Sequence, residues 1–134
     1  MSVIDASVFV DALVGVGVHG DRARAELRDE SVLQVPAVFG AEAASALRGL
    51  VMRGELELVR SRTALEHVRR VRTLQYPFEP FAPRVWELRN SMTVYDAWYV
   101  ALAETLGTDL VTADSRLVKA EGPRCRVRRA GFAS

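Results

Sequence analysis

Four carboxylates stand apart from the other charged residues of this sequence because of where they occur. Asp5 directly follows a short apolar segment at the start of the chain, and Asp114 follows another apolar segment near its end. Glu42 and Asp96 instead lie within stretches whose apolar residues recur at helical spacing. Most other acidic residues belong to mixed-charge stretches typical of helix surfaces. These four are therefore the candidate catalytic residues of the chain.

The two aspartates are placed to lie at one edge of a sheet. The apolar segments 3–4 and 110–112 are predicted to be strands, and side chains just beyond the carboxyl ends of parallel strands line the crevice where ligands bind. Asp5 and Asp114 can therefore share that edge. Helix capping is the alternative for either residue alone, because each precedes a helical segment and aspartate is a favoured N-cap.

Glu42 is the only acidic residue between Glu30 and Glu55, and alanines surround it. Most residues on its side of the predicted helix, at positions 38, 39, 45 and 46, are apolar. A carboxylate on such a face is partly desolvated and needs a partner. The alternative is a glutamate at the edge of the buried face whose tip reaches water.

Asp96 stands in the first turn of a strongly apolar predicted helix. A cap at Thr93 with an acidic residue at the third helical position explains it structurally, and the helix dipole favours negative charge there. Alone, Asp96 is best explained in this way. Three aromatic residues nevertheless crowd around the carboxylate: Tyr95, Trp98 and Tyr99.

Considered together, the four carboxylates predict a site for divalent cations. Carboxylates brought close together repel one another, so some stay protonated unless a cation neutralises them. Oxygen-only ligands select hard ions, Mg²⁺ or Mn²⁺ rather than Zn²⁺. Such ions activate water and stabilise the leaving oxygen in phosphodiester hydrolysis. The sequence contains no Gly-rich phosphate loop, serine elbow or Cys–His pair that offers a better nucleophile.

Short apolar strands alternate with helical segments along the chain, without hairpin signals between them. This order predicts an α/β domain with a mostly parallel sheet, and the length of 134 residues fits a single domain over 1–134. The expected strands cover 3–4, 32–35, 110–112 and the region of Val127, with an edge strand over 76–79. The expected helices cover 6–13, 21–28, 38–52, 81–88, 93–106 and 115–119, with one or two more over 56–74.

The composition is that of a soluble globular protein, with 49% hydrophobic residues, 26% charged residues and a formal charge of +1. Cys125 is the only cysteine, which excludes an intrachain disulfide and a thiolate zinc site. His19 and His67 show no ligand spacing. The chain opens without a secretory signal and has no apolar run long enough to span a bilayer, so we expect a reducing, cytoplasmic location.

Three segments resemble, in order, motifs of PIN-domain ribonucleases, specifically VapC-type toxins of type II toxin–antitoxin (VapBC) systems. They are Val3-Ile4-Asp5-Ala6-Ser7, Tyr95-Asp96-Ala97-Trp98-Tyr99-Val100-Ala101-Leu102-Ala103, and Leu110-Val111-Thr112-Ala113-Asp114-Ser115-Arg116-Leu117. The lone helical Glu42 lies between the first and the second. The resemblance spans nearly the whole chain. It implies a three-layer α/β/α PIN-like fold around a central mostly parallel sheet, and Mg²⁺- or Mn²⁺-dependent endonuclease activity on RNA.

The resemblance also assigns residues and partners. The positions that match the acidic quartet of the family are Asp5, Glu42, Asp96 and Asp114. Asp5 and Asp96 are the expected direct metal ligands. The less specific matches, to polar positions that orient carboxylates or water, are Ser7 and Thr112. The resemblance further implies a homodimer, and inhibition by a cognate VapB-like antitoxin whose C-terminal segment occupies the groove at the active site.

Arginine accounts for all of the 18 basic residues except Lys119. Its planar fork matches phosphate, but a genome-wide composition bias explains the same count. Candidates for steering RNA are Arg48, Arg84 and Arg116, although the sequence does not separate them from the other arginines.

Three alternatives use the same residues differently. A phosphoacceptor receiver-like domain also places aspartates at strand ends, but it needs paired early acids, a mid-chain acceptor and a late strand-end lysine. Here the only lysine, Lys119, lies in a predicted helix after Asp114. A non-catalytic protein-binding α/β module would use the carboxylates as caps and solvated edges, without stabilisation by metal. A DNA- or flap-specific nuclease tends to carry extra helical insertions and more acids.

Overall fold

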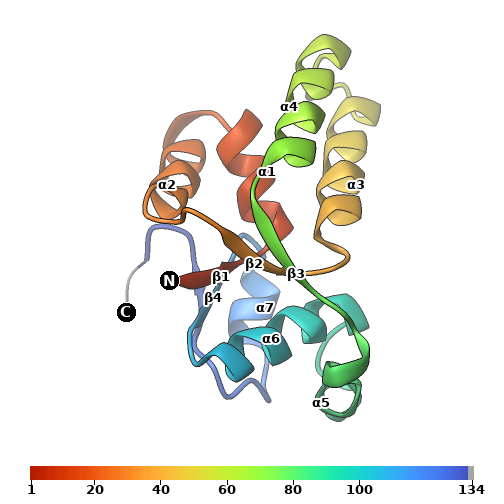
Figure 1. Ribbon diagram of the computed structural model, residues 1–134. Coiled ribbons are helices and arrows are strands. Elements are labelled where there is room, and N and C mark those ends of the chain that lie inside the picture. The colour runs from red at the N-terminus through yellow and green to blue at the C-terminus, as the bar shows by residue number, and fades with distance from the viewer. Residues whose placement is uncertain (133–134) are drawn as a thin grey trace.

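Within residues 1–132, which the computed structural model describes, five short strands cross the middle of the molecule and helices cover both sides (Figure 1). The strands are β1 (Ser2–Ile4), β2 (Leu33–Pro36), β3 (Thr73–Tyr76), β4 (Asp109–Thr112) and β5 (Val127–Arg129). The helices are α1 (Ala6–Val14), α2 (Gly17–Leu27), α3 (Phe39–Met52), α4 (Leu58–Arg70), α5 (Ala82–Glu87), α6 (Val94–Leu106) and α7 (Ser115–Lys119), with a 3₁₀ turn over Glu79–Phe81.

The strands pair in parallel. β4 lies between β1 and β5, and β2 pairs with β3. β2 also packs beside β1, so the strands form one central layer in two hydrogen-bonded pieces. Parallel neighbours require crossover connections, which the helices supply. Because Ile4 of β1 is in register with Val111 of β4, the carboxyl ends of the two strands reach the same edge of the layer.

The central strands are buried on both faces. Val3, Ile4, Leu110 and Val111 are almost inaccessible to solvent, because helices cover both faces of a parallel sheet. This explains why these segments appear in the sequence as continuous apolar runs rather than as alternating ones.

Figure 1 shows α1 to α4 on one side of the strands and α5 and α6 on the other, which confirms the predicted three-layer α/β/α fold. Every residue of α6 from Ala97 to Ala103 is buried, and the helix contacts β1, β2 and β4. Thr93 caps its start by accepting a hydrogen bond from the backbone amide of Asp96 (3.1 Å), and Gly107 ends it in the left-handed conformation (φ 67°). These two caps fix the first turn of α6 relative to the strands. Among the helices of residues 1–132, none has both the length and the apolar character needed to cross a membrane.

The edge strand begins earlier in the sequence than predicted. The helix expected over 56–74 ends at Arg70, and β3 occupies Thr73–Tyr76 rather than 76–79. This strand lies at the end of the strand layer, and its Leu74 side chain is 52% exposed. Because the side chains of β3 are little buried, the segment lacks the apolar pattern of a buried strand. The sequence therefore did not distinguish this strand from the preceding helix.

The helix predicted from position 21 begins at Gly17. Gly15 caps the end of α1 and Gly17 begins α2, and the two helices pack closely at this point. A Cβ atom at Gly20 would lie 2.3 Å from the Gly15 carbonyl oxygen. The glycines therefore allow close packing of two helices as well as the turn between them.

The central position of β4 leads to a stability prediction. We expect Leu110→Ala, which opens a cavity in a fully buried strand, to lower the free energy of unfolding by roughly 2–5 kcal/mol. Leu74→Ala, at an exposed position of β3, is the matched control and should cost less than about 1 kcal/mol. Urea unfolding measures both values, and equal losses would contradict a central β4 and an exposed β3.

Candidate active site

The carboxyl ends of β1 and β4 hold two of the four predicted carboxylates. Asp5 directly follows β1, caps α1 and is 9% exposed. Its Oδ2 atom accepts a hydrogen bond from the buried hydroxyl of Thr112, the last residue of β4 (2.8 Å). The Thr112 hydroxyl oxygen in turn accepts a hydrogen bond from the backbone amide of Asp114 (3.1 Å), the N-cap of α7. Thr112 therefore links the two strand-end aspartates.

Ser7 joins the same edge from the first turn of α1. Its hydroxyl accepts a hydrogen bond from the backbone amide of Ala113 (3.2 Å), and its own amide donates to Oδ1 of Asp5 (3.5 Å). The turn after β4 is thus tied to α1. Ser7 and Thr112 both lie where they can orient the aspartates.

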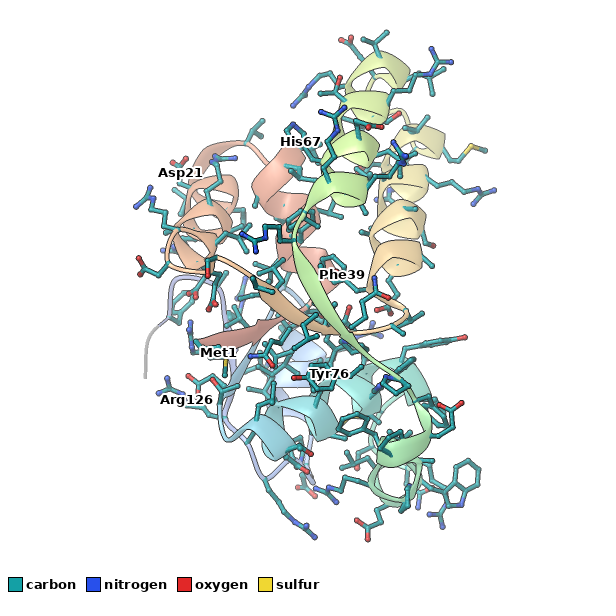
Figure 2. The ribbon with its side chains drawn as sticks, in the orientation of Figure 1. Met1, Asp21, Phe39, His67, Tyr76 and Arg126 are labelled. Atoms are coloured by element: carbon teal, nitrogen blue, oxygen red, sulfur yellow. The ribbon has the colours of Figure 1, made fainter. Side chains whose placement is uncertain are left out.

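Asp96 and Glu42 reach this edge from helices in different layers. Asp96 lies in the first turn of α6 and Glu42 in the first turn of α3, and both side chains are half-buried. Phe39 lies where α3 begins, beside the strands (Figure 2), and packs edge-to-face on Phe9 of α1 with 5.4 Å between ring centroids. This aromatic contact holds the first turn of α3, and with it Glu42, close to α1.

The four carboxylates lie close enough for their charges to act on one another. Burial raises the pKa of Asp5, and the hydrogen bond from Thr112 opposes that rise. Burial also raises the pKa of Asp96, and the charges of Asp5 and Asp114 raise it further. Burial raises the pKa of Glu42 to about 7, with smaller upward contributions from the charges of Asp5 and Asp96. The structure therefore brings the four predicted residues to one edge of the strand layer, hereafter the acidic edge, where the pKa values of Asp5, Glu42 and Asp96 are raised.

Tyr99 is a residue of this site that the sequence motifs alone did not assign a role. Its hydroxyl and the Oε1 atom of Glu42 are both buried, and neither has a hydrogen-bond partner among residues 1–132. The hydroxyl is near enough to lower the pKa of Glu42, but the two groups do not meet in hydrogen-bond geometry. Burial raises the pKa of Tyr99, so its hydroxyl stays protonated. Its position three residues after Asp96, on the same side of α6, was the available signal.

The donor set fits a hard divalent cation. An unpaired buried oxygen of Glu42, next to further carboxylates, is the kind of ligand that Mg²⁺ or Mn²⁺ prefers. In the described part of the chain, no three His, Cys, Asp or Glu side chains already lie as close together as metal ligands do.

Two hollows of the surface lead to the acidic edge. One, of about 430 Å³ between α1 and α3, is lined by Ser7 and Glu42. The other, of about 210 Å³, is lined by Asp96, Asp114 and Arg116. The acidic edge is therefore reached from two separate hollows of the surface.

The three arginines suggested for RNA lie in different settings. Arg116 lies at the acidic edge, with its Nε atom 3.5 Å from Asp114. Arg84 is mostly buried and pairs with Glu104 at 2.8 Å. Arg48 is exposed on α3 and lines an apolar groove between α3 and α4. Of these three, only Arg116 lies beside the carboxylates.

A family model described as PIN domain matches residues 2–123, which include all four carboxylates. The chain belongs to the PIN-domain family. This PIN domain is 40% identical to Ribonuclease VapC9 of Mycobacterium tuberculosis over 127 residues, which cover 95% of this chain and 96% of that protein. It is 39% identical to Ribonuclease VapC1 of the same organism over 127 residues, covering 94% of this chain and 95% of that protein. The resemblance to VapC-type PIN proteins expected from the motifs is confirmed.

The fold of this PIN domain is similar to the crystal structure of PAE2754 from Pyrobaculum aerophilum. The TM-score is 0.67 at 22% sequence identity, and the match covers 95% of this chain and 82% of that chain. This likeness supports the PIN fold independently of the residues at the site.

The pKa of Glu42 predicts a stability that depends on pH. The carboxyl ionises near 4.5 in the unfolded chain but near 7 in the PIN domain, so its ionisation destabilises the fold progressively as the pH rises between these values. In chelator, Glu42→Gln should therefore stabilise the protein by on the order of 1 kcal/mol at about pH 8, after allowance for solvent screening, and should change little at about pH 4. Thermal unfolding at both pH values measures this. Glu55→Gln, an exposed position, is the control, and a Glu42→Gln effect independent of pH would contradict the assignment.

Thr112 provides a second prediction. Thr112→Val removes the hydroxyl that donates to Asp5 and accepts from Asp114, and leaves both groups without that partner in a buried position. We expect a loss of about 1–3 kcal/mol in the free energy of unfolding at neutral pH. Thr112→Ser keeps the hydroxyl and should lose less, by urea unfolding. A Val variant as stable as the Ser variant would show that the hydrogen bonds contribute little.

Proposed function

We propose that this protein is a Mg²⁺- or Mn²⁺-dependent endoribonuclease of the VapC type, a toxin neutralised by a cognate VapB-like antitoxin. The observation that carries the proposal is the convergence of Asp5, Glu42, Asp96 and Asp114 at the carboxyl edge of β1 and β4. Burial raises the pKa of Asp5, and burial together with neighbouring carboxylate charges raises the pKa values of Glu42 and Asp96. Membership of the PIN-domain family and relatives named VapC ribonucleases support RNA as the substrate.

Each residue of the acidic edge would have a role in the proposed cleavage reaction. Asp5 and Asp96 would hold the cation most directly, and Glu42 and Asp114 would complete the set. When bound, a divalent ion supplies activation of the attacking water and neutralises charge on the leaving 3′ oxygen. Thr112 holds the Asp5 carboxylate in one orientation. Glu42 would bind the cation through its buried Oε1 atom, which has no hydrogen-bond partner among residues 1–132.

The proposal includes partners. An RNA strand would be the substrate, and the antitoxin would bind where its C-terminal segment blocks the acidic edge. The hollow between α1 and α3, lined by Ser7 and Glu42, offers such a place. A homodimer of single-domain chains acting in the cytoplasm, where RNA is available, completes the proposal.

The other functional classes are less well supported. A receiver-like domain needs a lysine at the end of a strand, whereas Lys119 ends the short helix α7, and the chain belongs to the PIN family. A non-catalytic binding module is distinguished by experiment, because it would neither bind Mn²⁺ at the acidic edge nor cleave RNA.

Cleavage of RNA by the purified protein is the decisive measurement. We expect a labelled pool of structured and unstructured RNA to be cut with Mg²⁺ or Mn²⁺ but not with chelator. Asp96→Asn should reduce the rate at least about a hundredfold, because it removes a charged metal ligand. Asp29→Asn, an exposed position away from the site, is the matched control.

The outcomes separate the alternatives. Metal-dependent cleavage that is abolished in Asp96→Asn supports the nuclease and its centre. Tight Mn²⁺ binding without cleavage indicates a narrow RNA specificity. Wild-type rates in Asp96→Asn or Asp5→Ala would sink the assignment of the site, and neither cleavage nor metal binding would sink the proposed function.

A further inference from the structure

A second cluster of side chains lies next to the acidic edge and takes no part in the proposed reaction. It lines a cavity of about 240 Å³ between α1, α2, the end of β4 and the C-terminal segment. The wall of this cavity includes Thr112 and Ala113, which hydrogen-bond to Asp5 and Ser7 respectively. Any group bound in the cavity therefore lies directly beside the proposed reaction centre.

Two arginines that line the cavity have no ionic partner. Arg22 of α2 and Arg129 of β5 form no salt bridge within residues 1–132. The neighbouring Arg128 points to the other face of β5, where it pairs with Glu26 (2.7 Å) and Asp109 (3.1 Å). One short strand thus places one guanidinium in a structural ion-pair network and presents the next one to the cavity.

Phe132 holds the two guanidinium groups near each other. Their Cζ atoms, in Arg22 and Arg129, lie 4.8 Å and 5.8 Å from the centroid of its ring. The preceding Gly131 donates its backbone amide to Glu26 (2.9 Å), which fixes the segment to α2. A Cβ atom at Gly131 would lie 2.7 Å from the Arg22 side chain, so glycine is needed for this close approach. The Phe132 ring and its backbone segment therefore hold the guanidinium groups of Arg22 and Arg129 in place.

The charge balance of the cavity leaves the arginines available to an anion. Asp11 is the one acidic residue that lines the cavity within the described chain, and it is half-buried. Burial raises the pKa of Asp11, and the charge of His19 opposes that rise. Two adjacent guanidinium groups repel each other, and an anion between them removes that repulsion.

We propose that Arg22 and Arg129 bind a phosphate of the RNA strand next to the scissile bond, with Phe132 as their positioning residue. The inference rests on the proposed function, in which RNA is the substrate bound at the acidic edge. Planar guanidinium forks match the oxygens of a phosphate. The carboxylates of the edge repel the RNA backbone, so a cationic site beside them is needed to hold the strand. The cavity shares Thr112 and Ala113 with the acidic edge, which puts the two arginines beside the place where the scissile phosphate would bind.

The test is binding of a fluorescein-labelled single-stranded RNA oligonucleotide in chelator, followed by anisotropy over a range of salt concentrations. Arg22→Gln/Arg129→Gln should bind about tenfold more weakly than wild type, and the slope of log K against log salt should fall by about 0.7 for each phosphate that the variant no longer neutralises. Arg60→Gln/Arg62→Gln removes the same charge from exposed positions of α4 and is the matched control, with a much smaller effect. In cleavage assays with metal, the Arg22→Gln/Arg129→Gln variant (the cavity variant) should show a higher KM than wild type and a nearly unchanged kcat.

Further variants keep the test decisive if the double variant is unstable. Phe132→Leu retains both charges and removes their support, so it should weaken RNA binding without changing the salt slope as strongly. Equal losses of affinity in the cavity variant and the α4 control, or no loss in either, would overturn the proposal. The proposal would also be overturned if Arg22→Gln/Arg129→Gln bound a glutamate-rich peptide more weakly than wild type but bound RNA equally well. That result would assign the two arginines to a protein partner. If Arg22→Gln/Arg129→Gln cleaves RNA and binds it as tightly as wild type, only this inference is rejected. If the wild-type protein shows no metal-dependent cleavage, the proposed function is rejected.

Discussion

The buried hydrogen bond from Thr112 to Asp5 is the contact on which the acidic edge depends. It joins residues 107 positions apart in the chain, and it exists because β1 and β4 pair in parallel with their carboxyl ends aligned. The same hydroxyl oxygen accepts from the Asp114 amide, so one side chain sets the positions of two carboxylates. Ser7 adds a second tie between α1 and the turn after β4. The geometry of the edge is therefore fixed by strand pairing and two hydroxyl groups.

Ionisation of the carboxylates at the acidic edge destabilises the fold. Burial raises the pKa values of Asp5, Glu42 and Asp96, and the charges of neighbouring carboxylates raise those of Glu42 and Asp96 further, so ionising these groups near neutral pH costs free energy unless a cation is present. The fully buried strands and the apolar middle of α6 offset this cost through hydrophobic burial. A metal ion that neutralises the edge would then stabilise the protein as well as take part in its reaction.

The arginines divide into two groups with different partners. Arg84 and Arg128 pair with glutamates and join segments that are distant in sequence. Arg22 and Arg129 instead lie over the Phe132 ring beside the acidic edge, and neither forms a salt bridge within residues 1–132. The acidic edge attracts cations, whereas this adjacent cluster attracts anions. Such a pairing of opposite charges suits a substrate whose backbone is anionic and whose cleavage requires a metal.

The sequence by itself determined most of the elements and the identity of the acids. Continuous apolar runs marked the buried strands, and Thr93 and Gly107 marked the ends of α6, because burial and helix capping act over a few neighbouring residues. The exposed edge strand β3 was misplaced because its pairing with β2 is non-local and leaves little apolar pattern. Only the tertiary structure decided that the four carboxylates reach one edge of the strand layer, that the Tyr99 hydroxyl lies near Glu42, and that Arg129, which forms no salt bridge within residues 1–132, lines a cavity beside that edge. Those facts depend on contacts between residues far apart in the chain, and such contacts leave no periodic signal in a single sequence.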